Sequence, residues 1–80
     1  MPLDEAAVIG EMEKAIEASI ASLSEKLKPV LLLHDLEGLS YGEIAGVVGV
    51  PVGTVKSRLF LARAHLQAAL TKYLATEETQ

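Results

Sequence analysis

Cysteine is absent from this 80-residue chain, as is tryptophan, and only two tyrosines and one phenylalanine provide aromatic rings. Without cysteine the chain can form no disulfide, no thiolate metal site and no cysteine nucleophile. No apolar run approaches the roughly 18 residues of a membrane span, and the N-terminus is acidic where a signal peptide would be basic. The chain is therefore expected to be one small domain with no membrane insertion, located in the cytoplasm.

The net charge of −4 averages two halves that differ. Residues 1–40 carry eight acids and three bases, whereas residues 41–80 carry three acids and four bases. No acid occurs between Ile44 and Thr76, and all four bases of the second half lie in that window: Lys56, Arg58, Arg63 and Lys72. The asymmetry suggests two surfaces with different partners, the plainer interpretation being chance clustering in a short chain.

Helical periodicity dominates, and no segment alternates with period two for long enough to predict a strand. The first helix is expected over residues 4–19, where an apolar stripe repeats every four residues: Val8, Met12, Ile16 and Ile20. The second helix is expected to open at Ser22 or Ser24, with Ser22 and Glu25 as a capping box. Pro29 requires either a kink or a regular part that begins near it, and Gly38 ends the helix.

A second capping box, Ser40 with Glu43, predicts a short third helix over residues 41–48 that Gly49 stops. Pro51 then fixes the entry to a fourth helix, from Gly53 or Thr54 to about Leu74. The predicted organisation is an N-terminal helix over residues 1–21, a helix-turn-helix core over 22–75 and a disordered tail over 76–80.

The third and fourth helices have the spacing of a helix-turn-helix. Ala45 is small where the helices approach, Gly49 makes the turn with positive φ, and Val50 and Val55 pack one helix on the other. The fold class is therefore all-α, a four-helix domain containing a helix-turn-helix. The predicted core comprises Ile16, Leu27, Leu31, Ile44, Val48, Val55, Leu59 and Leu66.

Successive residues of the fourth helix turn by about 100°. Its buried stripe is Val55, Leu59, Ala62, Leu66, Ala69 and Tyr73, while Ser57, Phe60 and Leu61 point the opposite way. Lys56 and Arg63 flank the stripe on one edge and Arg58 on the other. The exposed first turns thus suit a DNA major groove, with cations for guanine or phosphate and Phe60 for a thymine methyl.

Other interpretations of these residues stay open. Arg63 could instead form a salt bridge to an acid of the first two helices, and Phe60 with Leu61 could form a protein contact. His34 and His65 have no plausible third ligand, so both are expected to be structural or solvent-exposed, and no metal site or cofactor is expected. Ser57 has no evident His and Asp partners, so no enzyme activity is predicted.

The sequence LLLHDLEGLSYGEIAGVVGVPVGTVKSRLFLARAHLQAAL resembles region 4 of bacterial sigma factors of the extracytoplasmic-function (ECF) class. The blocks EGLSYGEIA (37–45) and GVPVGTVKSRLF-ARAHL (49–66, with Leu61 at the dash) follow that family's pattern almost throughout, and the similarity covers about residues 12–70. The resemblance implies a domain that binds the minus-35 promoter element, docks on the β-subunit flap of RNA polymerase and is held inactive by an anti-sigma factor.

Residue roles follow from the same resemblance. Lys56, Ser57, Phe60 and Leu61 match family positions that face the groove, and Arg58 and Arg63 match positions near the DNA backbone. At helix starts that meet phosphates, the matching residues are Ser40, Tyr41 and Thr54.

Two departures from the family pattern stand out. Leu61 occupies a position where the family usually has Arg, so one DNA contact is missing. Nothing in residues 1–20 resembles the preceding sigma region 2, so an excised C-terminal domain is expected rather than a stand-alone relative.

Two alternative functions remain. One is a region-4-like protein-interaction module bound by an anti-sigma factor, which Leu61 and the acidic net charge favour. The other is the output domain of a LuxR-type response regulator, which also has GLS, EIA and TVK. The block VPVGTVKSRL and the long first helix favour the sigma interpretation.

Overall fold

The computed structural model describes residues 4–74 of the chain. Four helices follow one another, α1 (Glu5–Ala21), α2 (Leu27–Asp35), α3 (Tyr41–Val48) and α4 (Val52–Ala69), and a single turn, α5 (Thr71–Leu74), comes last. No strand occurs among these residues. The predicted all-α, four-helix class is confirmed, and the predicted tail, residues 76–80, lies outside the described part.

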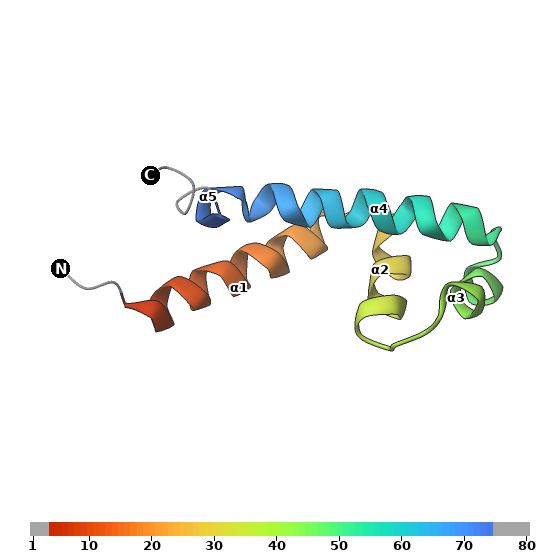
Figure 1. The fold of residues 1–80 in the computed structure, drawn as a ribbon, viewed down its shortest axis with the longest axis horizontal. Helices are drawn as coiled ribbons and strands as arrows, with labels where there is room; N and C mark the ends of the chain where they lie inside the picture. The colour runs from red at the N-terminus through yellow and green to blue at the C-terminus, as the bar shows by residue number, and fades with distance from the viewer. Residues whose placement is uncertain (1–3, 75–80) are drawn as a thin grey trace.

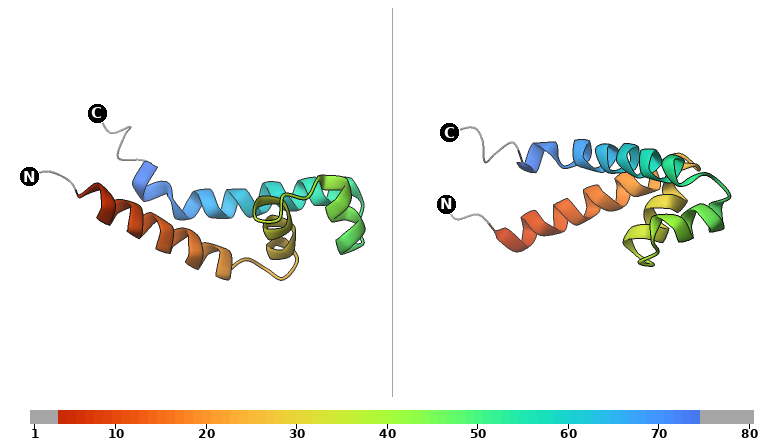
Figure 2. Two further views of the ribbon diagram at one scale, coloured as in Figure 1. Left: turned by 90° about the horizontal axis from the view of Figure 1, so that it is seen from below. Right: turned by 45° about the vertical axis from the view of Figure 1, so that its right-hand side comes forward.

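The domain is elongated, with principal extents of 52 × 22 × 20 Å. α4 forms its long axis, and α2 and α3 pack against the first half of that helix (Figure 1). α1 meets α4 near its middle and diverges from it, so that the start of α1 and α5 lie at the same end of the molecule (Figures 1 and 2). One end of α4 is therefore enclosed by neighbouring helices and the other end is more open.

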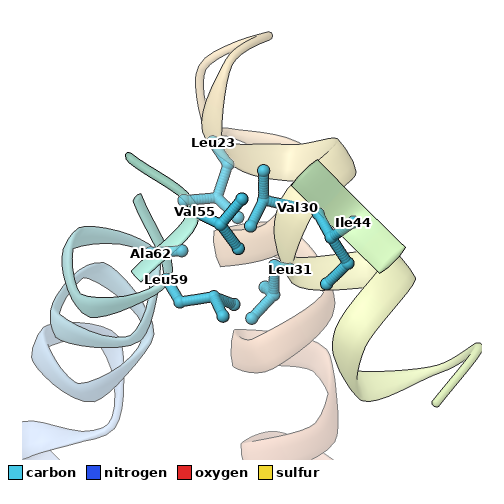
Figure 3. Close-up of a cluster of buried hydrophobic side chains, with 7 residues drawn as sticks. All are labelled: Leu23, Val30, Leu31, Ile44, Val55, Leu59 and Ala62. Carbon is cyan, nitrogen blue, oxygen red and sulfur yellow. The ribbon is translucent and has the colours of Figure 1, made fainter. Parts of the chain in front are cut away.

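The core lies between α2, α3 and the first half of α4 (Figure 3). Its buried apolar side chains are Leu23, Val30, Leu31, Ile44, Val55, Leu59 and Ala62. Val55, Leu59 and Ala62 recur every three or four residues, so one stripe of α4 faces the core as its helical period predicts.

The predicted core was wrong for Ile16, which is only half-buried and lies outside the core cluster. Leu27, Val48 and Leu66 are also half-buried, but they pack against that cluster. α1 diverges from α4 toward its N-terminal end (Figure 1), and of the α1 side chains Ile20, in the last turn, is the one that packs against the cluster.

The Ser22–Glu25 capping box does not form. Ser22 is the C-cap of α1, and α2 begins at Leu27. A helix starting after Ser22 would place Pro29 in its interior, where the missing N–H and the ring clash would break it. Starting at Leu27 places Pro29 third in the helix, where no intrahelical N–H bond is required.

The turns around α3 follow the predictions. The Ser40 hydroxyl accepts the Glu43 backbone N–H at 3.1 Å, and the Glu43 carboxylate accepts the Ser40 N–H at 2.8 Å. Gly38 and Gly49 have φ of 75° and 80°. A residue with a Cβ would be strained in this left-handed conformation, so both glycines are required by the backbone.

α3 and α4 are bent by 101° at their junction, in the range of a helix-turn-helix. α4 begins at Val52 rather than at Gly53 or Thr54, because the Pro51 carbonyl already accepts the N–H groups of Thr54 and Val55. It ends at Ala69, and only the turn α5 continues to Leu74. Across residues 4–74 no single helix combines the length and apolarity of a membrane span, although α3 and α4 counted together as a bent pair do.

Candidate nucleic-acid interface

The predicted DNA-contacting residues fall into two groups in the structure. Ser40 and Tyr41 lie at the start of α3. The others lie on the first three turns of α4: Thr54, Lys56, Ser57, Arg58, Phe60, Leu61 and Arg63. The tight turn at Gly49 joins the two helices, so both groups belong to one helix-turn-helix.

The face of α4 opposite the core is open to solvent. Lys56 and Ser57 are exposed, and Phe60 and Leu61 are 73% and 54% exposed. Val55 and Leu59 on the other face are almost fully buried. The core thus fixes the rotation of α4, and the exposed side chains of its first turns are available to a partner.

The three cations of α4 differ in environment. Lys56 is exposed and Arg58 is half-buried, and no acid of the described residues pairs with either. Arg63 Nη2 lies 2.9 Å from Oδ1 of Asp35, and Asp35 is the last residue of α2. The Asp35 carboxylate, with a smaller contribution from Tyr41, raises the pKa of the Arg63 guanidinium above its ordinary value. Lys56 and Arg58 are therefore the cations most available to a phosphate or a base.

The hydroxyl groups of Ser40 and Ser57 form local hydrogen bonds. Ser40 accepts a backbone N–H in the capping box, which leaves its hydroxyl hydrogen for a phosphate. Ser57 donates to the Thr54 carbonyl at 3.1 Å, so donation to a base would require that hydroxyl to rotate, whereas its oxygen can accept from a base amino group as it stands. Thr54 is half-buried in the first turn of α4.

Tyr41 is half-buried against His34, with ring centroids 5.1 Å apart. His34 Nδ1 lies 3.0 Å from the Leu39 carbonyl, and because a carbonyl only accepts, Nδ1 carries the hydrogen. His34 is thus structural rather than solvent-exposed, and its contact with Tyr41 was not predicted. Helical periodicity relates residues of one helix and carries no signal for a contact between two helices.

A groove of about 430 Å³ separates α1 from the second half of α4. Alanine, serine and one histidine line it, namely Ala15, Ala18, Ser19, Ser22, His65, Ala68 and Ala69. His65 is the one titratable group in this lining, so the groove holds no acid–base pair. Among residues 4–74 no three His, Asp or Glu side chains gather closely enough to hold a metal ion.

Comparison with known proteins gives consistent matches. A family model described as Sigma-70, region 4 matches residues 13–66. The RNA polymerase sigma-H factor of Pseudomonas aeruginosa is 45% identical over 64 residues, 80% of this chain and 33% of that protein. The ECF RNA polymerase sigma-E factor of Haemophilus influenzae is 49% identical over 53 residues, 66% of this chain and 28% of that protein.

The ECF RNA polymerase sigma-E factor of Escherichia coli K12 is 47% identical over the same number of residues, 53. The chain thus spans about a third, or less, of the length of these relatives. The matches favour the sigma interpretation over the LuxR-type alternative.

Proposed function

Because this chain belongs to the sigma-70 region 4 family and resembles its ECF members, we propose that it recognises the minus-35 element of a promoter. In this proposal the first turns of α4 enter the major groove, and the start of α3 meets the phosphate backbone. The domain acts in transcription initiation, as a binding module without catalysis. Such a function would place it in the cytoplasm.

The observation that carries the proposal is the exposed, acid-free face at the start of α4. Lys56 and Ser57 point to solvent, and no acidic side chain follows in the chain until Glu77. Duplex DNA attracts cations along its whole length, and Lys56 has no acid partner among the described residues to compete with phosphate. Base contacts would come from Lys56, Ser57 and Phe60, and backbone contacts from Ser40, Tyr41, Thr54 and Arg58.

The test compares two lysine substitutions of equal charge. Lys56→Ala should weaken binding to a duplex selected from a random library by ~1–3 kcal/mol, mostly at one base position. Lys14→Ala removes one exposed cation from α1, far along the chain from α4, and should leave the base preference unchanged. Equal losses in the two variants, or no selected duplex for the parent chain, would contradict the proposal.

The contact with RNA polymerase is proposed to be the flap of the β subunit, which the family resemblance implies. This contact would hold the domain on the enzyme while α4 faces DNA. A binding assay between the 80-residue chain and an isolated β flap tests it without DNA. The Lys56→Ala variant should bind the flap like the parent if the two surfaces are separate.

A second candidate partner, an anti-sigma factor, is favoured by the exposure of Phe60 and Leu61. Leu61 gains nothing from phosphates, but burial against a protein would contribute roughly 25 cal/mol per Å² of apolar surface. Leu61→Arg should strengthen DNA binding by adding a cation and weaken an anti-sigma complex by burying an unpaired charge. An unchanged affinity for the anti-sigma factor would remove Leu61 from that interface.

A further inference from the structure

The ion pair between Arg63 and Asp35 joins the middle of α4 to the end of α2. The two charged atoms lie 2.9 Å apart, and the side chains are 47% and 42% exposed. Asp35 is the last residue of α2, directly after His34. Exposed pairs of this kind contribute little to folding stability, so the position of this pair suggests a more local role.

The neighbours of Asp35 lead to the start of α3. His34 donates from Nδ1 to the carbonyl of Leu39, in the loop that precedes α3. The His34 ring also packs on the ring of Tyr41, the first residue of α3. Tyr41 in turn lies close enough to Arg63 to raise the pKa of the guanidinium. The end of α2, the start of α3 and the middle of α4 therefore meet at one point.

We propose that Arg63 is a positioning residue, which through Asp35 holds the start of α3 in place beside α4. This inference rests on the proposed DNA binding, since the start of α3 is one of the two segments that would meet DNA. Arg63 is then not itself a phosphate contact, in contrast to the role that the family resemblance implies for this position. The ion pair fixes Tyr41, and with it the capping Ser40, relative to the first turns of α4.

The two roles of Arg63 predict opposite signs for a substitution of Asp35. If Arg63 contacts a phosphate, Asp35→Asn releases its guanidinium and removes a negative charge, and DNA binding becomes tighter. If Arg63 positions α3, the same substitution loosens the DNA-binding surface, and binding becomes weaker. General electrostatics cannot produce that loss, because Asp35→Asn makes the domain less acidic.

The matched control is Glu37→Gln, which removes an exposed acid two residues away. No cation of the described residues pairs with Glu37 at ion-pair distance. We expect Asp35→Asn to bind the selected duplex about two- to five-fold more weakly than the parent chain. Glu37→Gln should bind as tightly as the parent or slightly more tightly.

The charge-swapped pair, Asp35→Arg with Arg63→Asp, keeps the net charge and allows the ion pair to form in reverse. The swap should restore most of the affinity that Arg63→Gln loses, and Arg63→Gln should leave the salt dependence of binding unchanged. A phosphate contact predicts no rescue and a shallower salt dependence. Either of those results, or Asp35→Asn binding as tightly as the parent, would overturn the positioning role.

An NMR measurement on the DNA-free domain separates this inference from the proposed function. The ring signals of Tyr41 should shift in Asp35→Asn and stay in place in Glu37→Gln, whether or not the chain binds DNA. A parent chain that selects no duplex would refute DNA binding alone. Unshifted Tyr41 signals would refute the positioning of α3 and leave DNA binding untouched.

Discussion

The two ends of the domain are held together by different kinds of contact. At the reading end, which we define as α2, α3 and α4 up to Ala62, six side chains form the core with Leu23, which precedes α2. At the open end, which we define as α1 and α4 from Arg63 to Ala69, the one buried residue is Ser19, a polar one. The apolar stripe of α1 is only half-buried.

Polar contacts connect the helices of the open end. Ser22 Oγ lies 2.9 Å from His65 Nε2, and the Ser19 hydroxyl donates to the His65 carbonyl at 3.5 Å. Apolar burial is the largest favourable term in folding, whereas each hydrogen bond adds little net stability. The open end should therefore be the part of the domain with the lower local stability. The proposed DNA-binding surface thus rests on the better-packed part of the molecule.

The largest difference in the free energy of unfolding is expected between substitutions of two isoleucines, one in each end of the domain. Ile44 is fully buried, so Ile44→Ala should lower the free energy of unfolding by about 2–5 kcal/mol. Ile16 is half-buried, so Ile16→Ala should cost roughly 1 kcal/mol. Urea denaturation of both variants measures the difference, and the milder pair Ile44→Val and Ile16→Val applies if Ile44→Ala does not fold. Equal losses would show that the open end is packed as well as the reading end.

Two glycines should respond in opposite directions to the same substitution. Gly49 has φ of 80°, so Gly49→Ala forces a Cβ into the left-handed region and should destabilise the domain by about 1–2 kcal/mol. Gly10 lies inside α1, and apart from its two chain neighbours and the backbone of α1 itself no atom lies within 4 Å of the position that a Cβ would take there. Gly10→Ala should therefore stabilise the domain by roughly 0.5–1 kcal/mol.

Thermal unfolding, followed by circular dichroism, shows whether each glycine variant is more or less stable than the parent chain. The control is Gly46→Ala, in the interior of α3, where φ is not positive and the Cβ position is open. A more stable Gly49→Ala variant would contradict the left-handed geometry of the turn. A loss in Gly10→Ala would indicate that α1 is packed more tightly at Gly10 than its open surroundings imply.

Sequence reasoning succeeded where neighbouring residues decide the structure. The box of Ser40 with Glu43, the positive φ of Gly49 and the buried stripe through Val55 and Leu59 each follow from residues a few positions apart. It failed at Ser22, where the S-x-x-E pattern is present but Pro29 shifts the helix start to Leu27. The capping pattern and the proline conflicted there, and the steric restriction of the proline determined where the helix begins.

Contacts between helices were the part that the sequence could not supply. Arg63 was expected either at the DNA backbone or in a salt bridge to one of the first two helices, without a named partner. Only the packing of α2 on α4 identifies Asp35. Ile16 was placed in the core because periodicity gives the direction of a side chain, but not whether another helix lies there. The assignment of the DNA-contacting residues stays a prediction.

The smallest expected difference concerns the two serines that were predicted to cap helices. Ser40→Ala removes a hydroxyl that caps α3 and should cost about 1 kcal/mol. Ser22 caps no helix start: its hydroxyl donates to the Ser19 carbonyl at 2.9 Å, so toward His65 Nε2 its oxygen must accept. Because Ser22 is exposed, Ser22→Ala should cost only about 0.5 kcal/mol, at the lower end for a hydrogen bond.

A second measurement on Ser22→Ala, the tautomer of His65, does not depend on this small change in stability. A hydroxyl has one hydrogen, and that of Ser22 is directed to Ser19, so neutral His65 must carry its hydrogen on Nε2. Nitrogen NMR should report this tautomer in the parent chain and a mixture of tautomers in Ser22→Ala, while Ser40→Ala leaves His65 unchanged. If His65 carried its hydrogen on Nδ1 in the parent, the Ser22 hydroxyl would have to donate to Nε2, and its bond to the Ser19 carbonyl would be lost. The bond from the Ser19 hydroxyl to the His65 carbonyl does not depend on the ring tautomer, so the open end would keep a polar contact between α1 and α4 in either case.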